Sequence, residues 1–123
     1  MSNAALEKFG YILMRKVRDE AVTDWKMIID GRMKGELAEK IRLILRGFSE
    51  YERKLLLVII PAVVDTVLHH FLWTAEQNSD LQVAIRMEDD FKRIHDLSDG
   101  LPGELYSDEG WIARFSKEDR FLI

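Results

Sequence analysis

The chain contains no cysteine and only two prolines among its 123 residues. The absence of cysteine excludes a disulfide framework, a thiolate zinc site and a thiol nucleophile, and it fits a reducing compartment. The N-terminal MSNAALEKFG has neither the basic stretch nor the long apolar core of a secretory signal. We therefore expect a cytoplasmic protein.

The common motifs of nucleotide and acyl-transfer enzymes are also missing. The sequence has no G-x-G-x-x-G and no G-x-x-x-x-G-K-[ST], which would supply a glycine-rich phosphate cradle, and it has no G-x-S-x-G. The acidic stretches EDD and DLSDG do not match the calcium loop pattern. No cofactor is predicted, and catalysis is not the expected role.

Long hydrophobic runs are scarce. The longest, LLLVIIPAVV at residues 55–64, has ten residues, whereas a membrane span needs about 20. Extending it to Ala75 would place Asp65 in hydrocarbon, at a cost of about 3 kcal/mol. We expect no membrane partner and interpret the run as a core helix, apolar almost all round and therefore packed on several sides.

The composition is that of an ordinary globular protein, with 47% hydrophobic and 33% charged residues. Residues 1–123 are expected to form a single domain. Residues 1–4, whose SNA is typical of a cloning remnant, are expected to be such a remnant or disordered.

The apolar spacing predicts three main helices. Leu6, Phe9, Leu13, Val17, Ala21, Trp25 and Ile28 recur every three or four residues, which predicts one helix over residues 4–31. A second helix is predicted over residues 35–46. The SEYE stretch predicts a capping box in which Ser49 and Glu52 open a third helix, and Pro61 should kink or restart it.

After Asn78 the apolar residues no longer recur every third or fourth residue, as in a helix, but every second residue. Leu81, Val83, Ile85 and Met87 predict a strand, with EDD as a turn and FKRIHDL as the return strand. Residues 104–115 suggest one or two short helices. The predicted fold class is α+β, predominantly α: three main helices around a central apolar helix, a small β-hairpin and a short C-terminal helical segment.

A polar stripe crosses the third helix. Asp65 and His69 stand at positions i and i+4, where a carboxylate can accept a hydrogen bond from an imidazole. That pair is the geometry of a general base, and with Trp73, Glu76 and Gln77 it could line a ligand site. We favour a structural role, because a polar group in a core persists when it is hydrogen-bonded.

The three histidines give only weak support for a metal-binding site. His69 and His70 point about 100° apart on a helix and cannot easily bind the same ion. A site would need Asp65, His69 and His95 to converge in three dimensions.

Charge is unevenly distributed along the chain. Residues 1–54 carry 12 Lys/Arg and 9 Asp/Glu, and residues 55–123 carry 6 and 13. An acidic region can steer a basic partner, as in an immunity or inhibitor protein that neutralises a toxin. The candidate contacts are Asp89, Asp90, Asp96, Asp99, Glu104 and Asp108. A nucleic-acid partner is not expected, because the isoelectric point is near 5.4 and the basic residues are interleaved with acids.

Two stretches, DTVLHHFLW and SDGLPGELYSDEGWIARFS, resemble a family of small bacterial proteins of unknown function. The resemblance covers about residues 55–117 and implies a bacterial origin but no activity. The sequence thus favours a small bacterial interaction protein that binds another protein or itself, since an exposed face on the first helix could form a homodimer. The alternative is a ligand- or metal-binding helical protein, or an enzyme, that uses Asp65 and His69.

Overall fold

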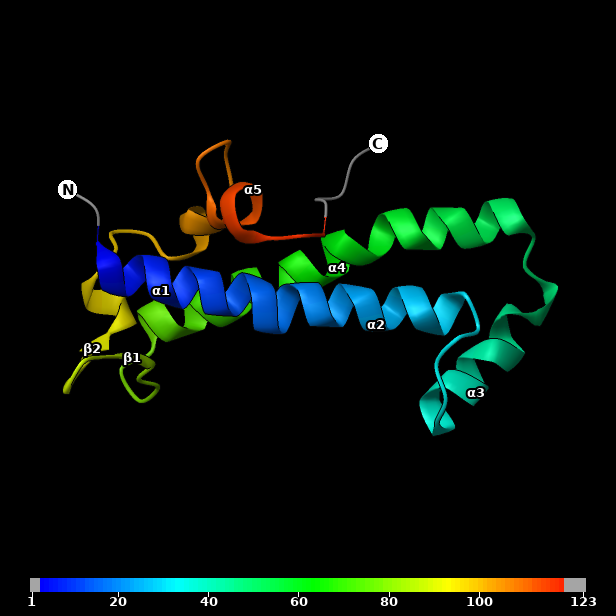
Figure 1. Ribbon diagram of the computed structural model, residues 1–123, viewed down its shortest axis with the longest axis horizontal. Coiled ribbons are helices and arrows are strands. Elements are labelled where there is room, and N and C mark those ends of the chain that lie inside the picture. Colours follow the sequence, from blue (N-terminus) through cyan, green and yellow to red (C-terminus); the bar gives the residue numbers. More distant parts are fainter. Residues whose placement is uncertain (1–2, 119–123) are drawn as a thin grey trace.

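Two long helical segments lie side by side and form the frame of the protein (Figure 1). The computed structural model describes residues 3–118. The first segment comprises α1 (Ala4–Ile12), a π-helical stretch (Leu13–Arg18) and α2 (Asp19–Ile29). The second is α4 (Glu50–Gln77), and α3 (Glu36–Ile44) connects the two at one end of the molecule.

The other end carries the small elements. Strands β1 (Ala84–Met87) and β2 (Asp90–Arg93) form an antiparallel hairpin in which Ala84 pairs with Arg93 and Met87 with Asp90. A 3₁₀ turn (Pro102–Leu105) and α5 (Trp111–Phe115) follow. The predicted α+β, mostly α fold class is therefore confirmed.

Local signals in the sequence account for the element boundaries. The Ser49 hydroxyl accepts a hydrogen bond from the Glu52 backbone N–H, and the Glu52 carboxylate accepts one from the Ser49 N–H, so the predicted capping box is confirmed. The Asn3 side chain caps α1 by accepting from the Leu6 N–H. Asn3 thus caps α1, which begins at Ala4, where the predicted first helix also begins. Helix α4 does not restart at Pro61 but continues through it.

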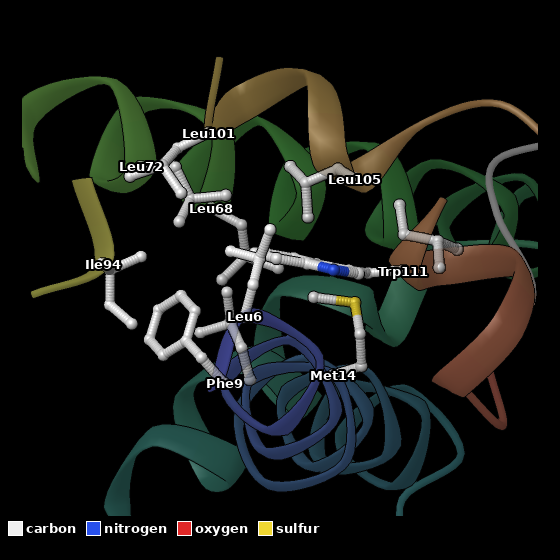
Figure 2. Close-up of a cluster of buried hydrophobic side chains, with 11 residues drawn as sticks. Leu6, Phe9, Met14, Leu68, Leu72, Ile94, Leu101, Leu105 and Trp111 are labelled. Carbon is white, nitrogen blue, oxygen red and sulfur yellow. The ribbon is translucent and has the colours of Figure 1, made fainter. Parts of the chain in front are cut away.

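The hydrophobic core lies between α1, the C-terminal half of α4 and the segments after the hairpin. Figure 2 shows Trp111 at its centre, with Leu6 and Met14 from the first helical segment on one side and Leu105 on the other. Phe9 contacts Trp111 edge to face, with ring centroids 5.7 Å apart. Gly10 allows this approach, because a Cβ at that position would lie 2.5 Å from the Trp111 ring.

The π-helical stretch changes which residues of the first segment face the core. A π-turn has i→i+5 hydrogen bonds, as in the bond from the Asp19 N–H to the Met14 carbonyl, so it adds one residue to the turn. By the end of this stretch the buried face has therefore shifted: Val17 is 46% exposed, whereas Arg18 is fully buried. The prediction that Val17 continues the apolar face of the helix is wrong.

Helix α4 is also less buried than the sequence suggested. Its buried residues are Pro61, Asp65, Leu68, Leu72 and Ala75, which lie along one face. Leu55, Val58, Ile59 and Val63 are exposed. The prediction that residues 55–64 pack on several sides is wrong, because α2 packs on α4 whereas α3 packs mainly on α2.

Candidate functional site

The buried polar group at the middle of α4 is an ion pair between Asp65 and Arg18. Arg18 donates from Nε to Asp65 Oδ1 at 2.6 Å and from Nη2 to Asp65 Oδ2 at 3.2 Å. This is a two-bond contact between a guanidinium and a carboxylate, which fixes both groups in orientation. The pair joins the first helical segment to α4.

Asp19, the next residue, binds the chain after α5. Its carboxylate accepts hydrogen bonds from the backbone N–H groups of Lys117 at 2.8 Å and Glu118 at 3.2 Å, and from the Ser116 hydroxyl. Arg18 Nη1 also donates to Ser116 Oγ at 2.7 Å. The cluster thus connects three separate parts of the chain, and its contacts are those of a structural element.

The predicted Asp65–His69 pair does not form. His69 Nδ1 lies 3.1 Å from the Tyr106 hydroxyl, and none of the hydrogen bonds between residues 3 and 118 joins Asp65 to His69. Because Arg18 occupies the Asp65 carboxylate, that carboxylate cannot orient the imidazole as a general base. The expected hydrogen bond between Asp65 and His69 is therefore wrong, and a catalytic role for either residue stays a prediction.

The other residues of the predicted ligand site point in different directions. Glu76 accepts from the Leu101 N–H at 2.6 Å and so holds the 3₁₀ turn against α4. Trp73 and Gln77 line a shallow surface hollow at the end of α4, without His69 or Glu76. The structure therefore does not bring His69, Trp73, Glu76 and Gln77 together around one cavity.

The three residues of the predicted metal site do not converge in the structure. Among residues 3–118 no group of three His, Cys, Asp or Glu side chains is placed to hold a metal ion, so Asp65, His69 and His95 do not meet. His95 instead lies beside Asp96, with Nε2 3.2 Å from Oδ1.

The predicted acidic contact residues lie on the hairpin and the loops after it. Five of them are exposed and Glu104 is half-buried. Lys92, which donates a hydrogen bond to Asp90, lowers the pKa of that carboxyl, assisted by the Phe91 backbone N–H. Arg93 pairs with Asp96 at 2.9 Å. Part of the acidic charge is thus balanced locally, and a role for all six residues in binding stays a prediction.

An apolar groove lies between α2, α3 and α4. It encloses about 420 Å³ and its lining is entirely apolar, comprising Trp25, Ile29, Ile41, Ile44, Leu45, Phe48, Leu56, Ile59, Ile60, Val63 and Val64. Among the described residues, neither a charged side chain nor a hydroxyl lines it, so it suits another apolar surface. The groove was not predicted from the sequence, although the entirely apolar stretch 55–64 contributes much of its lining.

An exposed apolar stripe continues from the groove along α4. Leu55, Ile59, Val63, Val67 and Phe71 follow at intervals of four residues and are 38–64% exposed. We call these five residues the α4 stripe. By length and composition α4 could cross a membrane, and only 22% of its most apolar 18-residue window is buried.

Comparisons with protein-family models, with curated proteins and with solved structures found no match for this chain. The resemblance to a bacterial family described above stays a prediction.

Proposed function

We propose that the protein is a small cytoplasmic interaction protein, and that the α4 stripe and the adjacent groove dock another protein. The observation that supports this proposal is the exposure of Ile59, Val63 and Val67 beside an entirely apolar groove. Monomeric soluble proteins rarely leave large contiguous apolar patches in water, and such patches mark interaction sites.

The α4 stripe can supply part of the free energy that binding requires. Covering a half-exposed aliphatic side chain contributes about 1 kcal/mol. The five residues of the α4 stripe therefore offer roughly 5 kcal/mol before the groove is counted, and before the entropic cost of association is subtracted.

A protein partner fits this surface better than a lipid bilayer. A membrane-spanning α4 would carry the Asp65–Arg18 ion pair, and the helical segment attached to it, to the depth of the hydrocarbon. Thr66, His70 and Thr74 are also exposed on the same helix. A protein surface can meet such groups with hydrogen bonds, whereas hydrocarbon cannot.

The acidic hairpin region would act by steering the encounter with a basic partner. An immunity or inhibitor protein is one form of this proposal. In that form Asp89, Asp99 and Asp108 would set the rate of association, and the apolar surface would supply the affinity.

Photo-crosslinking in the host cell tests the proposal. A photo-reactive amino acid is introduced at position 63, and at position 58 as a matched control, because both valines are exposed on α4 but lie about 140° apart around it. We expect adducts with protein at position 63 and few at position 58. Equal yields at the two positions, or adducts with lipid alone, would contradict the proposal.

A further inference from the structure

Trp73 differs from the other two tryptophans of the chain because it is open to solvent. Trp111 is buried in the core and Trp25 is half-buried, whereas Trp73 is 51% exposed. Trp73 lines the hollow at the end of α4, where the chain turns towards the hairpin (Figure 1). We propose that this hollow binds a neutral saccharide, with one sugar ring stacked on the Trp73 indole. The hollow shares no residue with the α4 stripe, so this inference does not depend on the proposed function.

The rest of the lining consists of hydroxyl and amide side chains, which belong to Thr74, Gln77, Asn78 and Ser79. Hydroxyl and amide groups can both donate and accept hydrogen bonds, as the hydroxyls of a sugar do. The hollow thus combines one aromatic surface with several polar groups. This combination suits a ligand that has an apolar face and a polar rim, and a pyranose ring has that form.

The indole of Trp73 can attract the C–H groups of a sugar ring. The face of an aromatic ring carries negative charge density, whereas its edge carries positive charge density. The ring carbons of a pyranose are bonded to oxygen, so their hydrogens carry partial positive charge and are attracted to the aromatic face. The indole N–H at the ring edge can in addition donate a hydrogen bond to a sugar oxygen.

Several polar groups of the hollow are available to a ligand. Among residues 3–118, the hydroxyls of Thr74 and Ser79 and the indole N–H of Trp73 have no hydrogen-bond partner within the protein. The Asn78 Oδ1 accepts a hydrogen bond from the Asp80 N–H at 2.9 Å, which orients the side chain and leaves its NH₂ group to donate. These groups are all exposed, so a bound sugar could reach them without a change in the fold.

The charge of the hollow favours a neutral ligand. In the part of the chain that the structure describes, no charged side chain lines it. A phosphate, sulfate or carboxylate would therefore meet no cation there, and the C-terminal end of α4 carries partial negative charge, which disfavours an anion. A cationic ligand would likewise meet no carboxylate in the lining.

The size and depth of the hollow indicate a small ligand that binds weakly. Its volume is about 390 Å³, which lies at the lower end of the range of about 300–1,000 Å³ for small-molecule sites. Because the hollow is shallow, it covers one side of a ligand, whereas deep pockets enclose about 70–90% of the ligand surface. We therefore expect a mono- or disaccharide to bind with a dissociation constant in the millimolar range.

An NMR titration of the full chain with the methyl glycosides of glucose, galactose, mannose and N-acetylglucosamine provides the first test. The chain has three tryptophans, so the nitrogen-15-labelled protein gives three indole N–H signals, and Trp73→Phe identifies the one that belongs to Trp73. At least one glycoside should shift the Trp73 signal until it saturates. The Trp111 signal should not move, because Trp111 is buried in the core.

Two substitutions test the stacking and the polar contacts separately, with the backbone amide of Ser79 as the signal that is followed. Trp73→Leu removes the aromatic face from an exposed position, so it should raise the dissociation constant roughly tenfold with unchanged circular dichroism. Thr74→Val replaces a hydroxyl by a methyl group and should raise the dissociation constant about threefold to tenfold. Tyr51→Leu, which removes an exposed aromatic ring at the other end of α4, is the matched control and should bind normally.

Four results would overturn the inference. The first is no saturable shift of the Trp73 signal with any of the four glycosides, and the second is an equal shift with glycerol, which has hydroxyls but no ring. The third is unchanged affinity in both Trp73→Leu and Thr74→Val. The fourth is a shift with tetramethylammonium but with none of the glycosides, which would assign the hollow to a cation held by the aromatic face. None of these results bears on photo-crosslinking at position 63, so the proposed function and this inference can fail separately.

Discussion

Arg18 and Asp65, which are 47 residues apart in the sequence, form a buried ion pair with Arg18 Nε 2.6 Å from Asp65 Oδ1. This contact fixes α4 against the first helical segment at the point where the π-turn directs Arg18 inward. It also removes Asp65 from any chemistry with His69. The following predictions test the pair, the core, the His69 environment and the cap of α4.

Asp65→Ala should lower the free energy of unfolding by about 3–5 kcal/mol, because it removes the carboxylate that makes two hydrogen bonds with the buried Arg18 guanidinium. Urea denaturation followed by circular dichroism measures this change. The double variant Arg18→Met with Asp65→Leu should lose less than the sum of the two single changes, since apolar residues can replace a buried ion pair. Additive losses would show that the two side chains are not coupled.

Gly10→Ala should destabilise the protein by about 1–3 kcal/mol, because the added Cβ would lie 2.5 Å from the Trp111 ring in a filled core. Gly47→Ala is the matched control, since nothing lies within 4 Å of a Cβ at that position. The control should be neutral or slightly stabilising. Thermal and urea unfolding of both variants provide the comparison, and equal effects would contradict the packing of Trp111 on α1.

Tyr106→Phe should cost about 1 kcal/mol, because it removes the hydroxyl that lies 3.1 Å from His69 Nδ1. The exposed Tyr51 offers a control, and Tyr51→Phe should leave the free energy of unfolding unchanged. The Nδ1 chemical shift of His69 should also change in Tyr106→Phe. An unaltered shift would show that the hydrogen bond is not formed in solution.

The capping box predicts a pH dependence at the start of α4. The Ser49 backbone N–H, and next the Ser49 hydroxyl, hydrogen-bond to Glu52 and lower its pKa below 4.5. The stabilisation that results is therefore complete above pH 4.5 and is lost as the pH falls through the lowered pKa of the folded state. Ser49→Ala should move the pKa of Glu52 part of the way back towards 4.5, because it removes the hydroxyl but keeps the backbone N–H; a carboxyl NMR titration measures this change. An identical titration curve in the variant would contradict the capping box.

The sequence by itself determined the elements that depend on neighbouring residues. The period of the apolar residues predicted the helices, the SEYE stretch predicted the capping box, and alternation followed by EDD predicted the hairpin. These predictions succeeded because helix caps, turns and amphipathic faces are set by interactions within a few residues.

Only the tertiary structure decided which distant groups meet. Periodicity could not show that a π-turn shifts the inward face, so Arg18, rather than His69, is the partner of Asp65. Nor could it show that α3 leaves half of α4 uncovered, because an apolar sequence is the same whether it packs inside one chain or against another. Burial is a property of the arrangement of elements in space, and no single segment of the sequence specifies it.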